Sequence, residues 1–269
     1  MTRLLLCCAI ALAAACGSSR STFARYPGAP AAFDRAGSEA KAVEIADKVF
    51  TASGGPGNWD KAKQVRWKQN VTSDGKAAPE IEEAWDRWNA RHAGSLTRGD
   101  GSIKVGYELY GKFSMGFMQR GQKKEILDDE SRTKALGTAK GVFNIDTAVL
   151  TMQFLMLEPG AKLKYVGTAK DDAGSENYDE VAVTFDDPLR KELEFHVVVD
   201  RTSNLIARIE MLKIGTTQKV GYSLKDWTTV NGLKFAASRT NLGYSGETTA
   251  ITEIRVGEPE DELFIAPLY

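Results

Sequence analysis

Residues 193–199 read Leu-Glu-Phe-His-Val-Val-Val and place Leu193, Phe195, Val197 and Val199 at every second position. Because successive side chains of a β-strand point to opposite faces, this segment has one apolar face and one polar face. The same alternation recurs in both directions along the chain, in residues 65–71, 105–113, 181–185 and 220–224. One apolar, buried face and one polar, solvent-exposed face are typical of antiparallel sheets, and the pattern therefore predicts a mainly β fold.

Turn signals separate these alternating segments. Asn231-Gly232 is the strongest, because both residues tolerate the positive φ angles that a type I′ hairpin turn requires. The other signals are Ser73-Asp74-Gly75, Gly99-Asp100-Gly101, Asp171-Asp172-Ala173-Gly174 and Tyr244-Ser245-Gly246. Short strands joined by tight turns predict a sheet of consecutive hairpins.

A helix is expected to open the fold. Ser38 is placed to serve as its N-cap, and Glu39 favours the first turn. Apolar residues then recur at helical spacing, at Val43, Ala46, Val49 and Phe50. Gly54-Gly55 followed by Pro56 is expected to end this helix.

One segment, residues 147–157 (TAVLTMQFLML), is apolar on almost every side. Asp146 is placed to cap it, and Pro159-Gly160 is placed to end it. A helix without a polar face must be buried on most sides, so we expect it to lie in the concavity of a curved sheet. A fully buried strand is the alternative for this segment.

The three cysteines fall within the first sixteen residues, and the last of them, Cys16, follows the run Leu-Ala-Ala-Ala. The apolar stretch 4–15 would rise about 18 Å as a helix, too short for a bilayer core of roughly 30 Å. Residues 1–15 therefore indicate a signal peptide. A cysteine after small residues resembles the lipobox of bacterial lipoproteins, which implies that Cys16 carries the lipid. An ordinary secretory signal with a chance cysteine is the alternative.

The rest of the chain sets limits on location and partners. Residues 16–37 are rich in Gly, Ser, Ala and Pro and are expected to form a flexible tether, followed by one domain at 38–269. The 35 basic and 36 acidic side chains give no net field that would attract nucleic acid. The lipid is thus the expected membrane attachment, and Gly17, where inner-membrane retention would use aspartate, favours the outer membrane facing the periplasm. We expect a monomer.

The C-terminal third carries motifs in a recognisable order. They are the hairpin Val230-Asn231-Gly232-Leu233-Lys234-Phe235, the strand 251–256 and the closing segment 261–267, which reads Asp-Glu-Leu-Phe-Ile-Ala-Pro. This series resembles the LolA/LolB-like superfamily of periplasmic proteins that sort outer-membrane lipoproteins. The resemblance covers residues 42–267. It implies an incomplete antiparallel β-barrel of about eleven strands, covered or plugged by helices, around a cavity that binds acyl chains.

The sequence offers little that points to catalysis. His92 and His196 are its two histidines, and neither belongs to a paired metal-ligand spacing. Nucleophile-elbow and phosphate-loop motifs are absent, and the body after Cys16 has no cysteine nucleophile. We therefore expect no enzyme, no metal and no cofactor.

The aromatic residues Trp67, Trp85, Trp88 and Tyr107 fit either a lipid pocket or the ordinary core between sheet and helix. The hydrophobic ligand site is predicted to consist of Trp67, Trp85, Tyr107, Phe113, Met152 and Leu155. Three functions follow from these observations and the resemblance: a lipid or lipoprotein carrier or receptor, an interaction or stress-sensing module with an envelope protein partner, and a hydrolase. The first is favoured and the hydrolase is the least favoured.

Overall fold

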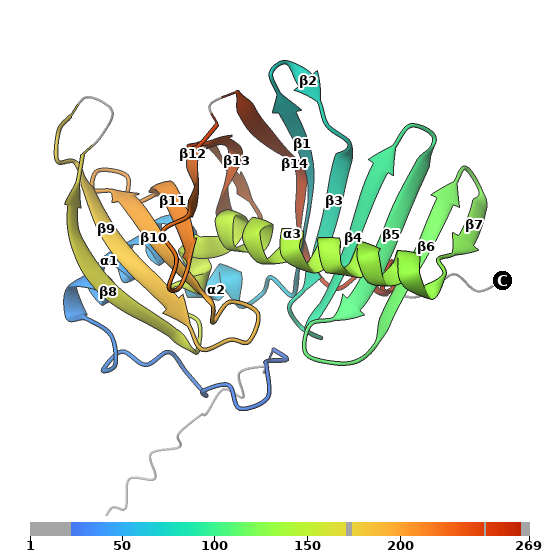
Figure 1. Cartoon of the computed structure of the whole chain (residues 1–269). Coiled ribbons are helices and arrows are strands. Elements are labelled where there is room, and N and C mark those ends of the chain that lie inside the picture. Colours follow the sequence, from blue (N-terminus) through green and yellow to red (C-terminus); the bar gives the residue numbers. More distant parts are fainter. Residues whose placement is uncertain (1–22, 171–173, 245, 265–269) are drawn as a thin grey trace, which may run out of the picture.

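The computed structural model describes residues 23–170, 174–244 and 246–264 (Figure 1). Its strands form one antiparallel sheet in the order β7-β6-β5-β4-β3-β1-β14-β13-β12-β11-β10-β9-β8, with β2 paired to β1. The first seven strands are β1 (Gln64–Ser73), β2 (Lys76–Ala77), β3 (Glu80–Asp86), β4 (Arg91–Arg98), β5 (Gly101–Glu108), β6 (Ser114–Arg120) and β7 (Lys123–Ile126). The others are β8 (Ala161–Ala169), β9 (Tyr178–Phe185), β10 (Leu193–Asp200), β11 (Ile206–Lys213), β12 (Lys219–Val230), β13 (Leu233–Asn241) and β14 (Glu247–Gly257).

The sheet consists of two runs of hairpins, β1–β7 and β8–β14, which join where β1 pairs with β14. In the described part of the chain, its edge strands β7 and β8 do not pair with each other, so the barrel is incomplete, as predicted. The described residues form fourteen strands, where about eleven were expected. The short strands β2 and β7 are exposed, and His92 and Gly94 interrupt the apolar face of β4, so these strands give weak alternation.

The hairpin turn at Asn231-Gly232 is confirmed. Val230 pairs with Leu233, and the two residues between them have φ angles of 49° and 78°. Both values lie in the left-handed region that a type I′ turn needs, which suits asparagine and glycine.

Helix α3 (Asp129–Leu155) contains the predicted apolar segment and crosses the concave side of the sheet (Figure 1). The helix is longer than expected because Asp128 caps it: its Oδ1 accepts a hydrogen bond from the Ser131 amide at 2.8 Å. The expectation that Asp146 is the cap is wrong, since Asp146 lies in the middle of the helix. Residues 129–142 are mostly exposed, and the sequence pattern therefore concealed the first half of the helix.

Helix α1 (Ala40–Ala52) begins after the predicted N-cap, Ser38. The Ser38 hydroxyl instead accepts a hydrogen bond from the amide of Leu163, and the Glu39 carboxylate accepts one from the amide of Tyr165. These two side chains therefore satisfy backbone donors of edge strand β8. The short helices α2 (Gly55–Trp59) and η1 (Asp261–Leu263) complete the fold.

Most of the core lies between the sheet and the helices. One cluster joins α1 and the second half of α3 to β8–β13, with Val149, Met152 and Phe195 buried. A second joins α2 and α3 to β1, β13 and β14 around Trp67 and Phe154. The concavity of the half-barrel is therefore filled by the chain itself in its central and β8–β13 parts.

The second half of the predicted tether makes contacts with the body. Residues 23–37 lie against the body: Phe23 packs edge-on against Trp88 at 5.5 Å between ring centroids, and Tyr26 packs against Tyr110 at 6.0 Å. Arg35 also forms an ion pair with Asp47 of α1. The aromatic residues interspersed in this Gly/Ala/Pro-rich stretch provide the contacts. Cys16 and the rest of the expected tether lie outside the described residues.

Candidate functional site

Helix α3 is attached to the concave face by aromatic contacts. The Phe143 ring lies 4.5 Å from the His92 ring and 6.2 Å from the Trp85 ring. Further along, Phe154 stacks on Trp59 at 4.2 Å between centroids. Because the helix covers these rings, a ligand reaching the floor of the concavity would first have to displace it.

The six predicted site residues do not line one open cavity. Trp67, Met152 and Leu155 are buried in the core, and Tyr107 is buried beside His92. Trp85 is half-buried between the two large clusters. A void of about 10 Å³ beside Trp67 has room for one water molecule at most. A ligand-binding role for these residues stays a prediction.

Phe113 lies apart from the other five. It belongs to the connection between β5 and β6, not to the alternating strand in which the sequence placed it, and it is 48% exposed. The strand ends earlier because residues 109–112 turn back toward β6, and Phe113 therefore has no position on the concave face.

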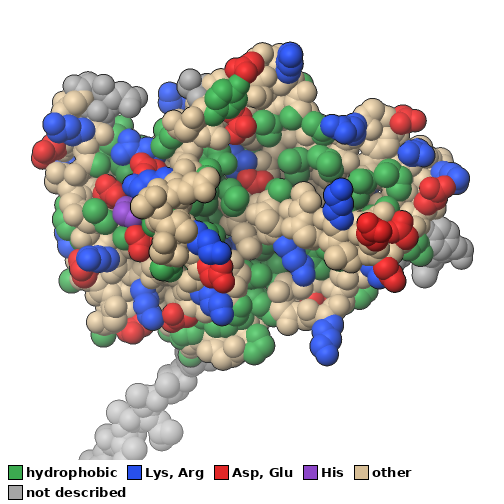
Figure 2. Space-filling view, viewed as in Figure 1, with side chains coloured by type: hydrophobic (Ala, Val, Ile, Leu, Met, Phe, Trp, Pro, Cys, Tyr) green, Lys and Arg blue, Asp and Glu red, His purple; other side chains and the backbone are tan. Residues whose placement is uncertain are grey.

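Part of the concave face beside α3 is apolar and uncovered. The sheet register places Ile81 opposite Leu96, Leu96 opposite Ile103, and Ile103 opposite Met118. Directly opposed residues share a face of the sheet, so these four side chains form a continuous row across β3–β6, which we call the apolar row. Leu96 is 40% exposed and the others are half-buried. Figure 2 shows hydrophobic side chains gathered on this side of the molecule.

The apolar row stays open because α3 lies over the adjacent rows. Phe143 contacts Trp85 and His92 there, and the Lys140 ammonium lies 5.3 Å from the Tyr107 ring centroid. Gly116 gives the start of the helix room: a Cβ at this position would come 3.2 Å from Leu127 Cδ1. The helix therefore leaves the apolar row, four residues along the strands from Trp85, His92 and Tyr107, free of cover.

A buried polar cluster lies at the β1 end of the apolar row, where Gln69 pairs with Ile81. Gln69 Nε2 donates to Asp146 Oδ2 at 2.7 Å and to Glu83 Oε1 at 2.8 Å. Arg239 Nη2 donates to Asp146 Oδ1 at 2.6 Å and to Gln69 Oε1 at 2.7 Å. The cluster therefore ties the middle of α3 to strands β1, β3 and β13.

The charge state of this cluster follows from its burial. Burial and the nearby Asp146 carboxylate raise the pKa of Glu83 well above its usual value. Burial lowers the pKa of His92, whose Nε2 lies 3.2 Å from Glu83 Oε2, to about 3. Both pKa shifts favour the uncharged forms of the Glu83 carboxyl and the His92 imidazole, and Asp146 and Arg239 form an ion pair at 2.6 Å beside them.

Sequence reasoning missed this cluster. Gln69 sits in the apolar register of β1, and Asp146 precedes the apolar segment of α3; each was a visible departure from its pattern. Arg239 and Glu83 gave no such signal, because charged residues alternate with apolar ones throughout the sheet. Only the tertiary fold brings these four positions together.

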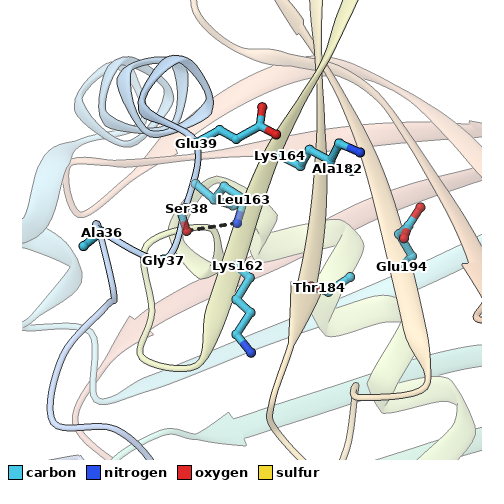
Figure 3. Close-up of a pocket in the computed structure, with 10 residues that line it drawn as sticks. All are labelled: Ala36, Gly37, Ser38, Glu39, Lys162, Leu163, Lys164, Ala182, Thr184 and Glu194. Atoms are coloured by element: carbon cyan, nitrogen blue, oxygen red, sulfur yellow. Dashed lines mark hydrogen bonds between the residues drawn. The ribbon is translucent and has the colours of Figure 1, made fainter.

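A polar pocket of about 470 Å³ lies elsewhere, on the outer face of β8–β10 beside the segment that leads into α1 (Figure 3). Lys162, Thr184 and Glu194 line it from adjacent strands. Its charged lining makes it unsuitable for an acyl chain.

The described residues offer neither a metal-ion cluster nor a membrane-spanning helix. They contain no group of three or more histidine, cysteine, aspartate or glutamate side chains placed to hold a metal ion. None of the described helices has the length and apolar character needed to span a membrane.

The fold has counterparts among solved structures. A DUF1329 family protein from Desulfovibrio piger is 10% identical, with a TM-score of 0.51 over 83% of this chain and 97% of that one. The chain shares the fold of this protein. The match is also extensive for a LolA superfamily protein from Nitrosomonas europaea (9% identical, TM-score 0.47, 84% of this chain and 97% of that one). A putative outer membrane lipoprotein-sorting protein domain from Vibrio parahaemolyticus is 9% identical, with a TM-score of 0.46 over 83% of this chain and 96% of that one.

No family model matches this sequence, and no curated protein does. At these identities the structural likeness concerns the fold alone. The predicted open antiparallel half-barrel with helices in its concavity is confirmed.

Proposed function

We propose that this protein is a LolA-like, lipid-anchored envelope lipoprotein that binds an acyl chain along the apolar row. It would act as a carrier or receptor in the sorting of lipoproteins or lipids to the outer membrane, on its periplasmic side. The observation that carries the proposal is the uncovered row Ile81, Leu96, Ile103 and Met118 beside a helix that fills the rest of the concavity.

The shape of the apolar row suits a single extended chain. Four adjacent strands span about 14 Å from the first side chain to the last. Helical spacing also places Val142, Ala139 and Ala135 on the same face of α3 as Asp146, which contacts Gln69 at the end of the row. A chain lying along this strip would bury its methylenes on two sides, at about 0.8 kcal/mol each.

We expect Leu96→Gln to weaken binding of a dansyl-labelled medium-chain fatty acid by about tenfold, because it places an amide in the middle of the strip. Leu96 is already 40% exposed, so the substitution should leave the unfolding transition nearly unchanged. Fluorescence titration and urea unfolding on the same protein sample would measure both effects.

Ile214→Gln is the matched control. Ile214 is 52% exposed, and it follows β11 at a distance from the apolar row along the sheet. This variant should bind the probe like the wild type. Equal losses in the two variants would show that the probe adsorbs to exposed apolar side chains in general, and the proposed site would then be abandoned.

The anchor is tested at Cys16. We expect the wild-type protein to incorporate an alkynyl fatty acid in cells and to fractionate with the outer membrane, whereas Cys16→Ser should incorporate none and become soluble. The reason is the small-residue run before this cysteine. A wild type without label, or a serine variant that stays with the membrane, would contradict lipidation at this position.

A second candidate function is a non-catalytic interaction or envelope-stress-sensing module, favoured by the filled concavity and its void of only about 10 Å³. In that case an envelope protein would be the partner and α3 would be permanent core. Native mass spectrometry of the delipidated body separates the two candidates, because co-purifying lipid supports the first and lipid-free protein that binds no probe supports the second.

A further inference from the structure

The apolar row ends next to the guanidinium group of Arg239. Gln69 ends the row at β1, and its side-chain oxygen accepts a hydrogen bond from Arg239 Nη2 at 2.7 Å. Arg239 is 7% exposed. Its guanidinium carbon lies 4.9 Å from the centroid of the Tyr222 ring. An apolar strip that ends at a buried cation is complementary to an amphiphile with one anionic head.

This end of the row has unused hydrogen-bond donors. Arg239 Nε and Trp67 Nε1 are buried, and within the described residues neither has a hydrogen-bond partner. Both residues line the void of about 10 Å³, together with Asp146. Buried donors without partners are costly, so an acceptor that reached this end of the row would satisfy donors that the protein itself leaves unpaired.

The place that an anion would take at Arg239 is occupied by α3 itself. Asp146 Oδ1 accepts the Arg239 hydrogen bond at 2.6 Å, and Asp146 lies at the start of the buried half of the helix. Of the neighbouring titratable groups, Glu83 has a raised pKa and His92 a lowered one, and both shifts favour the uncharged form. One external anion in place of Asp146 would keep the charge of the cluster balanced.

We propose that Arg239 binds the anionic head of an amphiphilic ligand, a carboxylate or a phosphate, and that Asp146 holds this place until the ligand displaces it. The chain of the ligand lies along the apolar row, so this inference rests on the proposed function. Because Asp146 belongs to α3, its displacement also frees the middle of the helix from β1 and β13. Ligand binding is thereby coupled to movement of the helix.

The experiment compares three dansyl-labelled probes with the same chain: a fatty acid, its methyl ester and a lysophosphatidic acid. For the wild-type protein we expect an acidic probe to bind at least about tenfold more tightly than the ester, since only an anion exchanges with Asp146. The preferred acidic probe identifies the head as carboxylate or phosphate.

Asp146→Asn is the decisive variant, because it keeps the shape of the side chain and removes the competing charge. Affinity for the preferred acidic probe should rise by about tenfold while that for the ester stays constant. The double variant Asp146→Asn with Arg239→Gln keeps the cluster neutral but lacks the cation. It should bind the acidic probe and the methyl ester with about equal affinity. An Asp146→Asn variant with unchanged acid affinity would overturn the proposal, even if the double variant did not fold.

The outcomes also separate this inference from the proposed function. Equal binding of the ester and both acids by the wild type would overturn the anionic head site and leave acyl-chain binding intact. Failure of all three probes to bind folded wild-type protein would overturn both.

Discussion

Replacing Arg239 with methionine is expected to lower the free energy of unfolding by about 3–5 kcal/mol. Among the residues that the structure describes, the Arg239 guanidinium is the one cation hydrogen-bonded to Asp146, and both side chains are more than nine-tenths buried. Without it the Asp146 carboxylate would be an unpaired charge between α3 and the sheet, and Gln69 would lose a hydrogen-bond donor. Urea unfolding at neutral pH, followed by tryptophan fluorescence, would measure the loss.

The double variant Arg239→Met with Asp146→Leu is the control for that prediction. An apolar pair in place of a buried ion pair is often neutral or stabilising, so the second substitution should restore most of the lost stability. This result would identify the uncompensated charge, not lost packing, as the cause. A double variant as unstable as Arg239→Met alone would contradict the ion pair as the main attachment of α3.

Glu83→Gln is expected to make the protein acid-sensitive between pH 6.5 and pH 4.5. Burial lowers the pKa of His92 to about 3, so His92 contributes stability above its ordinary pKa of 6.5 and loses it as the pH falls below that value. Burial raises the pKa of Glu83, whose contribution is full below its ordinary pKa of 4.5 and is lost as the pH rises. In the wild type the two contributions therefore have opposite slopes across this range.

Removal of the Glu83 contribution leaves the His92 slope unopposed. The free energy of unfolding of Glu83→Gln should then fall by about 2 kcal/mol from pH 6.5 to pH 4.5, at up to about 1.4 kcal/mol per pH unit. The free energy of unfolding of the wild type should change less over this range. That of the double variant Glu83→Gln with His92→Gln should no longer fall with pH in this way. Chemical unfolding at three pH values would measure this, and parallel profiles for Glu83→Gln and the wild type would refute it.

The sequence was sufficient for features that depend on neighbouring residues. Alternation at Leu193, Phe195, Val197 and Val199 predicted β10, because a strand places every second side chain on the same face. The Asn231-Gly232 turn depended on the φ preferences of two adjacent residues. The segment after Asp146 was recognised as buried, with a helix favoured over a strand, because its surface is apolar on almost every side.

Only the tertiary structure decided which apolar residues are core and which are open. Trp67 and Leu96 both lie in sheet strands, yet α3 and the second cluster bury Trp67, whereas Leu96 lies in the row that the helix does not cover. The path of α3 follows from the cap at Asp128 and from the room left by Gly116. Neither signal lies near Leu96 in the sequence.

The polar cluster had the same origin. Gln69, Glu83, Asp146 and Arg239 are spread over 171 positions of the chain and meet because β1 pairs with β3 on one side and with β14 on the other, next to β13. Periodicity reports which face of an element is apolar, but it carries no information about which elements become neighbours. The sequence by itself therefore determined the sheet, its C-terminal hairpin and a buried helix, whereas long-range strand pairing decided where an ion pair and an open apolar row would lie.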